Sequence, residues 1–168
     1  MARTILILLV LFAGFSANSQ NIYIVRHAEK AAPGPDMKSD VSLSETGNQR
    51  AEALKEALQN EQIQAIYSTN TLRTRSTAAP TASLFGLNIQ SYGPYPDSAF
   101  AKSMIQLGKN VLIVGHSNTV DDLVNLIMGE KVIPGDLDES EYDNLYVIRF
   151  TNGVAKFEHR KFGAASAR

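Results

Sequence analysis

The sequence Ile-Tyr-Ile-Val-Arg-His-Ala-Glu-Lys, residues 22–30, begins with four apolar residues and continues with an arginine and a histidine. A second segment, Val-Leu-Ile-Val-Gly-His-Ser-Asn at residues 111–118, has the same form. Short apolar runs that end at a charge or a glycine are typical of buried β-strands. We therefore expect His27 and His116 each to follow the carboxyl end of a strand. Because ligands of open α/β sheets bind at that edge, the two imidazoles and Arg26 are expected to form an anion site.

The length and composition indicate a single globular domain. The chain has 168 residues, of which 44% are hydrophobic, so it can bury a substantial core and disorder is not expected. The formal charge is -1, from 16 basic and 17 acidic residues. Since there is no basic excess, neither nucleic acid nor an anionic membrane is expected as the main partner.

Residues 1–19 have the features of a secretory signal peptide. Arg3 supplies a positive charge, residues 5–15 form an apolar run, and Ala17-Asn18-Ser19 offers small residues at the positions that signal peptidase reads. We expect cleavage before Gln20. The alternative is a membrane anchor, but the run is shorter than the ~20 residues that a membrane span needs. The sequence thus predicts an exported protein, secreted or periplasmic, with no stable membrane insertion after cleavage.

The chain contains no cysteine. This excludes structural disulfides, a thiol nucleophile, thiolate metal sites and a lipid-modified cysteine after the leader. The chemistry has to come from histidine, arginine, carboxylate and hydroxyl side chains.

Strand-like and helix-like segments alternate along the rest of the chain. Further strands are predicted at 63–68 and 88–92, and a C-terminal hairpin is predicted at 145–150 and 154–160. Four helices are predicted. The first begins at Thr46, with Gln49 completing a capping box, and the second covers 72–85. The third runs from the cap Asp97 through Lys109, and the fourth ends at Gly129. Pro80 predicts a kink or break near Ala79. An acidic loop, residues 130–143, precedes the hairpin.

This order of elements predicts an α/β protein. It is expected to be a three-layer α/β/α sandwich, with a mostly parallel sheet that ends in an antiparallel C-terminal hairpin. The domain organisation expected is a signal peptide at 1–19, one domain at 20–162 and a flexible tail at 163–168.

Arg26, His27 and Arg73 carry the chemistry that these elements would bring together. A guanidinium is a permanently charged, planar fork for phosphate oxygens, and a neutral imidazole is a nucleophile near pH 7. Arg73 and Thr77 are four residues apart on one helix face, whereas Arg75 is rotated away by about 200°. Taken alone, His27 is explained more simply as a strand-end histidine with an exposed neighbour, and Arg73 is equally a surface charge.

Four segments resemble motifs of the histidine phosphatase superfamily, in its phosphoglycerate-mutase-like branch, and they occur in the family's order. They are Arg26-His27-Ala28-Glu29 (RHG/A-E), Leu43-Ser44-Glu45-Thr46-Gly47 with Gln49 and Ala51 (LTxxGxxQA), Thr69 to Ala78 (SxxxRxxxTA, with Thr69 in place of Ser) and Val114-Gly115-His116-Ser117 (VGH). Each motif is weakly specific alone, and together they span about 21–150.

The resemblance implies a mechanism and a set of roles. His27 would attack phosphorus and become phosphohistidine, while Arg26, Arg73 and His116 would hold the phosphoryl oxygens. Water would then release phosphate, and neither a metal nor another cofactor is implied. Glu29 would orient the loop or His27, and the alternative is a solvated charge pair with Lys30.

The acid that protonates the leaving group is the least defined residue. We expect Asp97 in this role because it would lie on a loop beside the crevice, but an Asp before a helix is also a typical N-cap. Glu29, Asp121 and Asp122 are the next candidates.

Departures from the family pattern limit the substrate. Mutases of the family carry RHGExxWN, whereas Lys30-Ala31-Ala32-Pro33 follows here, the chain has no Trp, and the segment between Tyr92 and Val111 is short. The chain thus resembles the short phosphatases, which implies an exported, metal-independent phosphatase acting on small phosphate monoesters. The alternatives are a phosphohistidine phosphatase, a phosphatase of lipopolysaccharide core sugars, or a non-catalytic phosphate-binding module. The sequence does not predict the oligomeric state.

Overall fold

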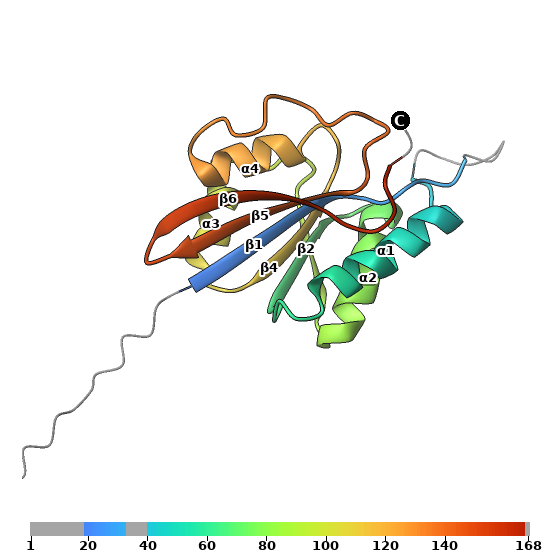
Figure 1. Cartoon of the computed structure of the whole chain (residues 1–168), viewed down its shortest axis with the longest axis horizontal. Coiled ribbons are helices and arrows are strands. Elements are labelled where there is room, and N and C mark those ends of the chain that lie inside the picture. The colour runs from blue at the N-terminus through green and yellow to red at the C-terminus, as the bar shows by residue number, and fades with distance from the viewer. Residues whose placement is uncertain (1–18, 33–39, 167–168) are drawn as a thin grey trace, which may run out of the picture.

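The computed structural model describes residues 19–32 and 40–166 of the chain. In this part, a six-stranded sheet and four helices form three layers (Figure 1). The strands are β1 (Ser19–Arg26), β2 (Ala65–Thr69), β3 (Ile89–Tyr92), β4 (Val111–Gly115), β5 (Asn144–Thr151) and β6 (Val154–Lys161). The helices are α1 (Glu45–Leu58), α2 (Leu72–Phe85), α3 (Ser98–Gln106) and α4 (Val120–Met128). The predicted α/β/α sandwich is confirmed.

The strand order explains how the two histidines meet. Across the sheet the order is β3-β2-β4-β1-β5-β6, with β1 to β4 parallel and the β5–β6 hairpin antiparallel, as predicted. β1 and β4 are direct neighbours, and their register pairs Arg26 with Gly115. His27 and His116 follow these two residues, so they leave the sheet together at its carboxyl edge.

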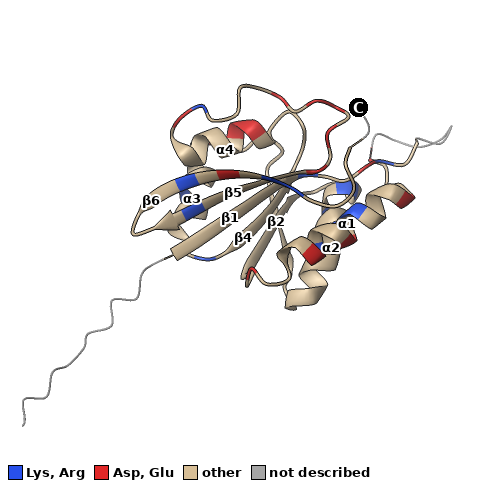
Figure 2. Cartoon of the chain, in the orientation of Figure 1, with Lys and Arg blue, Asp and Glu red and all other residues tan. Residues whose placement is uncertain are grey.

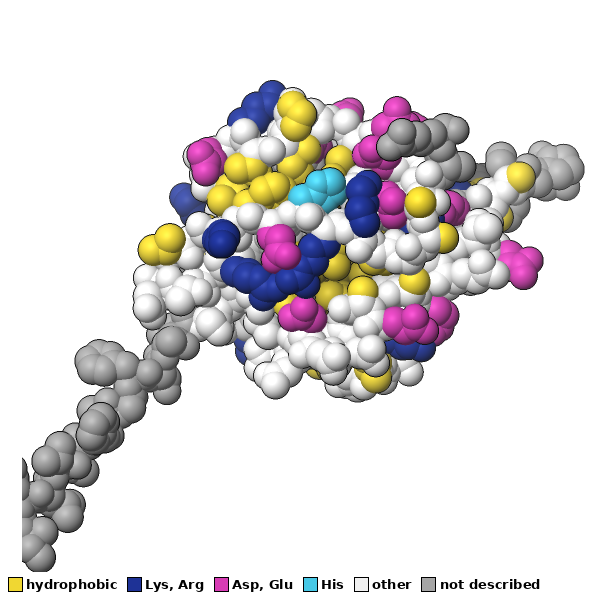
Figure 3. Space-filling view, viewed as in Figure 1, with side chains coloured by type: hydrophobic (Ala, Val, Ile, Leu, Met, Phe, Trp, Pro, Cys, Tyr) yellow, Lys and Arg dark blue, Asp and Glu magenta, His cyan; other side chains and the backbone are white. Residues whose placement is uncertain are grey.

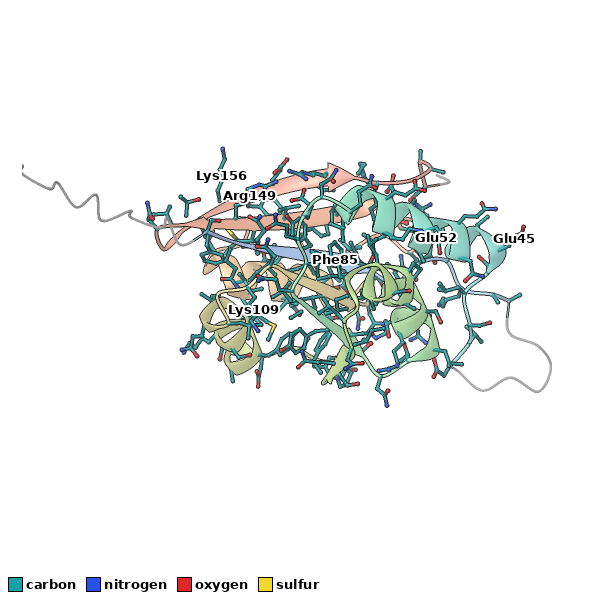
Figure 4. All side chains as sticks on the ribbon, turned by 90° about the horizontal axis from the view of Figure 1, so that it is seen from below. Glu45, Glu52, Phe85, Lys109, Arg149 and Lys156 are labelled. Carbon is teal, nitrogen blue, oxygen red and sulfur yellow. The ribbon has the colours of Figure 1, made fainter. Side chains whose placement is uncertain are left out.

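Each face of the sheet has its own hydrophobic core beneath a pair of helices. α1 and α2 lie on one face, and α3 and α4 lie on the other (Figures 1 and 4). Along β1, Ile22 and Ile24 belong to one core, while Tyr23 and Val25 belong to the other. A strand buried on both faces has to be apolar at every position, which is why this segment is a continuous apolar run.

Two predicted helix ends are corrected by the structure. α1 begins at Glu45, and its N-cap is Ser44, whose hydroxyl accepts a hydrogen bond from the Gly47 amide. Thr46 therefore lies within the first turn and does not cap the helix. α3 ends at Gln106 and not at Lys109, because Gly108 adopts a positive φ of 62°, which a right-handed helix does not permit.

Of the kink or break predicted near Ala79, the break is wrong, since α2 continues through Pro80. Proline removes one backbone donor, which normally disrupts a helix interior. Here Ala78 and Ala82, on either side of Pro80, are buried in the core that α1 and α2 share with the sheet. Packing of both halves offsets the lost hydrogen bond.

The N-terminal leader lies outside the described residues, except for Ser19, which is the first residue of β1. Gln20, where cleavage is predicted, is buried, and its side-chain amide donates to the Met104 carbonyl at 2.7 Å. Within residues 19–32 and 40–166, no helix is long and apolar enough to cross a membrane.

The C-terminal residues 163–166, predicted as part of a flexible tail, are tied to the acidic loop. The Ser166 hydroxyl accepts hydrogen bonds from the backbone amides of Tyr142 and Asp143. The tail thus fixes the end of the loop that precedes β5.

Basic and acidic side chains are mixed over the surface that Figures 2 and 3 show. This distribution agrees with the near-neutral formal charge of the sequence. A site that attracts an anion must therefore depend on a local group of basic side chains. Such side chains, Arg26 among them, lie at the edge of the sheet where the histidines are.

Candidate active site

His27 is held as a neutral imidazole with one nitrogen available. It follows β1, and its backbone amide donates to the Gly115 carbonyl at 2.9 Å. Its Nδ1 lies 2.8 Å from the Ala28 carbonyl oxygen, so Nδ1 carries the proton and Nε2 keeps its lone pair. The residue is only 3% exposed, and burial is the main cause that lowers the pKa of His27 to about 3. A neutral imidazole with a free Nε2 is a nucleophile.

His116 lies edge-on to His27, with the ring centroids 5.5 Å apart and the planes at 67°. Its Nε2 is hydrogen-bonded to the Thr69 hydroxyl at 2.8 Å. Burial, and then the charge of Arg73, lowers the pKa of His116 to about 4. The Thr69 hydroxyl thus positions the His116 ring.

Arg26 is enclosed by the acidic loop. Its Nη1 donates to the carbonyl oxygens of Asp138, Glu139 and Glu141 at 3.0, 3.0 and 3.2 Å, and its Nη2 donates to the Glu139 carboxylate at 2.6 Å. The Tyr142 ring lies 4.2 Å from the guanidinium carbon. Arg26 is 2% exposed, and its Nε has no hydrogen-bond partner among the described residues. A buried donor without a partner is costly, which indicates a place for a ligand acceptor.

Arg73 has a similar arrangement in the first turn of α2. It forms a longer ion pair with Asp40, at 3.5 Å, and its buried Nε also lacks a partner in the described part of the chain. Thr77, one turn later, accepts a hydrogen bond from the Ala28 amide at 2.9 Å and donates to the Arg73 carbonyl at 2.7 Å. The predicted shared face of Arg73 and Thr77 is therefore seen, and Arg75 reaches instead to the Ser91 hydroxyl.

These residues surround a cavity of about 340 Å³ at the carboxyl edge of the sheet. It is lined by Arg26, His27, Lys30, Thr71, Arg73, Pro94, Tyr95, His116, Ser117, Asn118, Thr119 and Glu139. Three cationic side chains, two of them with an unpartnered buried Nε, face the same space as a nucleophilic imidazole. No cluster of metal-ligating side chains occurs among the residues that the structure describes. The cavity suits a tetrahedral oxyanion.

Glu29 does not line this cavity. Both of its carboxylate oxygens accept hydrogen bonds from Arg50, at 2.6 to 2.9 Å, and Arg50 also donates to the Ala164 carbonyl. Neither predicted partner, His27 nor Lys30, is the one that Glu29 contacts. The ion pair instead supports the loop after His27, which Gly47 approaches so closely that a Cβ there would lie 2.2 Å from the Glu29 carbonyl oxygen.

None of the candidate acids of the sequence is among the residues that line the cavity. Asp97 is the N-cap of α3, accepting a hydrogen bond from the Phe100 amide at 2.9 Å. Asp121 is buried in α4, where burial raises its pKa, and Asp122 is exposed. Glu139 is the carboxylate that does line the cavity. Sequence reasoning identified the acidic loop but not this residue, and the loop's high acidic content was the available signal.

Comparison with known proteins agrees with this geometry. The family model of the histidine phosphatase superfamily (branch 1) matches residues 22–92, which include β1, α1, β2, α2 and β3. Over this segment the chain is similar to the histidine phosphatase superfamily. The match indicates a hydrolase of the phosphatase class. A search of the curated proteins finds no match.

Several solved structures share the fold of this chain. SixA from Agrobacterium tumefaciens is 22% identical, with a TM-score of 0.63 over 87% of this chain and 98% of that one. The protein histidine phosphatase SixA in complex with tungstate is 17% identical, with a TM-score of 0.65 over 84% and 96%. A mycobacterial glucosyl-3-phosphoglycerate phosphatase is 12% identical, with a TM-score of 0.63 over 88% and 100%.

Proposed function

We propose that this protein hydrolyses small phosphate monoesters through a phosphohistidine on His27, without a metal ion. The observation that carries the proposal is the neutral His27, with Nε2 available, beside two buried arginine Nε groups that lack partners among the described residues. A non-catalytic phosphate-binding module would need the arginines but not a preoriented nucleophile.

In the first step, Nε2 of His27 attacks phosphorus and the bond from phosphorus to the leaving oxygen breaks. Arg26 and Arg73 stabilise the charge that grows on the phosphoryl oxygens in the transition state. The leaving oxygen takes a proton from an acid or from water. In the second step, water attacks phosphorus, the bond to Nε2 breaks, and phosphate leaves with His27 restored.

His116 contributes differently before and after the substrate binds. In the free protein it is neutral, because burial and nearby cations lower its pKa. A phosphoryl dianion offsets those cations and favours the imidazolium, which can then donate a hydrogen bond to a phosphoryl oxygen. Thr69 holds the ring while its charge changes.

Hydrolysis of p-nitrophenyl phosphate by the purified mature protein, in the presence of EDTA, tests the proposal. We expect turnover that EDTA does not change and that vanadate inhibits, since cationic side chains and not a metal neutralise the phosphate. Activity that chelation removes and Zn²⁺ or Mg²⁺ restores would contradict metal independence. Absence of turnover together with tight phosphate binding would favour the binding module.

Export is a separate part of the proposal, and the leader supports it through Arg3 and the apolar run 5–15. Sequencing the N-terminus of the protein recovered outside the cytoplasm should give Gln20 as the first residue. Recovery only from the cytoplasm, with Met1 or Ala2 first, would contradict export.

A phosphohistidine phosphatase is the second candidate function. The similarity to SixA, which extends over nearly the whole length of that chain, favours it, while export disfavours it because phosphohistidine substrates are expected in the cytoplasm. Comparing kcat/KM for a phosphohistidine peptide with that for p-nitrophenyl phosphate separates the two candidates.

A further inference from the structure

Arg26 uses its donors unequally. Nη1 is held by three backbone carbonyls of the acidic loop, which fix the guanidinium in place. The other edge consists of Nε, which has no partner among the described residues, and Nη2, which donates to the Glu139 carboxylate at 2.6 Å and, at the longer distance of 3.4 Å, to the Tyr142 hydroxyl. An oxyanion binds an arginine best through two parallel hydrogen bonds from one edge of the fork. Nε and Nη2 form the edge of the guanidinium that remains for phosphate. The Glu139 carboxylate already contacts one of these two atoms, Nη2.

Glu139 is held at this position by two contacts. One carboxylate oxygen accepts from Arg26 Nη2 at 2.6 Å, and the other accepts from the Ser117 hydroxyl at 2.5 Å. These contacts lower the pKa of Glu139, the Ser117 hydrogen bond most strongly, so the group is an anion at neutral pH. An ionised carboxylate cannot protonate a leaving group, so its place in the cavity needs another explanation.

The Glu139 side chain can leave without disrupting the fold. It is 74% exposed, so its departure exposes no apolar core and water can replace both hydrogen bonds. Arg26 would stay in place, because the loop carbonyls that hold Nη1 belong to the backbone. The contacts thus separate a permanent anchor from a replaceable anion.

We propose that Glu139 occupies part of the phosphate site in the free protein and that the phosphoryl group of the substrate displaces it from Arg26. This inference rests on the proposed function, because it takes Arg26 as a phosphate ligand. Glu139 thereby sets the affinity of the site for phosphate. It weakens binding of the product, inorganic phosphate, as well as of the substrate, which favours product release.

Calorimetric titration of the full mature protein with inorganic phosphate, at fixed pH and ionic strength, tests the inference. In Glu139→Gln we expect the Kd for phosphate to fall about fivefold, which corresponds to about 1 kcal/mol, the upper range for an exposed ion pair. Glu139→Asp keeps the charge but is one methylene shorter, so it cannot span Arg26 and Ser117 together. Its Kd should also fall. Glu52→Gln, which removes an exposed carboxylate of α1 (labelled in Figure 4) that is not in the cavity lining, should leave Kd unchanged.

The other outcomes each contradict a specific claim. If Glu139→Asp binds phosphate like the wild type while Glu139→Gln binds more tightly, the effect is long-range charge and not competition for Arg26. If both variants bind phosphate with an unchanged or a higher Kd, the inference is also overturned, because Glu139 then does not compete with phosphate. If Glu139→Gln leaves Kd unchanged but turns over alkyl phosphates more slowly, Glu139 is the missing acid. A wild type that neither binds phosphate nor hydrolyses esters contradicts the proposed function itself.

Discussion

At the residue scale, the site depends on which atoms of each side chain are already engaged. His27 has one nitrogen tied to a carbonyl and one available, Arg26 has one edge anchored and one open to exchange, and Arg73 has an unpartnered buried Nε in the described part of the chain. The engaged atoms position each group, and the others are available for chemistry. Substitutions at these positions therefore separate positioning from reaction.

His27→Ala should abolish turnover, lowering kcat by a factor on the order of 10³ or more, because it removes the nucleophile. The fold should persist, since β1 and both cores are unchanged, and circular dichroism can check this. Acid-quenched labelling with a radioactive phosphate ester should give an acid-labile, base-stable phosphoenzyme only in the wild type. Label that persists in His27→Ala would place the covalent intermediate elsewhere.

Arg73→Ala should reduce kcat/KM far more than Arg75→Ala. Arg73 faces the cavity, and losing a charge-assisted contact to the phosphoryl group costs about 2–4 kcal/mol of transition-state binding. Arg75 contacts the Ser91 hydroxyl outside the cavity lining and serves as the matched control. Equal losses in the two variants would show that α2 does not present Arg73 to the substrate.

At the scale of single elements, the ends of helices and strands do the positioning. α2 contributes Arg73 from its first turn and joins the loop after β1 through Thr77, while α4 begins directly after the β4 loop that carries His116. The site is thus assembled from element ends that rigid strands and helices hold in register. Hydroxyl groups at these ends decide how firmly the elements are joined.

Thr77→Val should destabilise the protein and reduce activity, whereas Thr77→Ser should behave like the wild type. Valine keeps the shape but removes the oxygen that accepts from the Ala28 amide, leaving a buried donor unpaired at a cost of about 1–3 kcal/mol. Urea unfolding and kcat measured on the same samples check the prediction. A Val variant as stable and as active as wild type would mean that Thr77 does not link α2 to the nucleophile loop.

Asp97→Ala should lower the free energy of unfolding by about 0.5–2 kcal/mol and Asp97→Asn should not, because asparagine also caps a helix. The hydrogen bond from the Phe100 amide motivates this expectation. The role of leaving-group acid stays a prediction that the Asn variant tests. A selective loss of activity on an alkyl phosphate, with p-nitrophenyl phosphate unaffected and melting unchanged, would establish that role.

The sequence predicted strands and helix faces well, because those depend on local spacing. His27, His116 and Arg73 were placed at one edge on this basis, and the structure brings all three to one cavity. The partners of these residues could not be predicted in the same way. Arg26 is held largely by backbone carbonyls of residues more than a hundred positions later in the sequence. Because every residue has a carbonyl, the sequence does not indicate which ones bind Arg26. The pairing of Glu29 with Arg50 likewise depends on burial and not on spacing.

At the scale of the whole molecule, burying two neutral histidines links stability to pH. The pKa values of His27 and His116 in the folded protein, about 3 and 4, lie below the ordinary value of 6.5 that applies to the unfolded chain. Between these values the unfolded chain binds more protons, so acid favours unfolding. The stability that the two neutral imidazoles contribute is complete above about pH 6.5 and is lost as the pH falls toward 4 and 3.

Urea unfolding between pH 7 and pH 5 should therefore show stability that decreases toward acid, by at most about 1.4 kcal/mol per pH unit for each histidine. His27→Asn should reduce this slope, because it removes one of the three histidines whose pKa burial lowers, His159 being the third. This window lies above the range in which most carboxylates titrate, which isolates the histidines. A slope that is the same in the variant and the wild type would show that His27 is not buried as a neutral group.

The position of β4 between β1 and β2 has a consequence for folding. β4 is synthesised after β1, β2 and β3, yet it is the strand that joins β1 to the other two. The segment 22–92, which carries the family match, therefore lacks the strand needed to form one sheet and cannot be expected to fold by itself. Closing the long loop between β1 and β4 costs chain entropy, and the contacts between the two strands offset this cost only once they pair. The centre of the sheet should therefore form late, and the site that contains the two histidines should form with it. A nascent or exported chain would thus gain its nucleophile site only in the final cooperative step of folding.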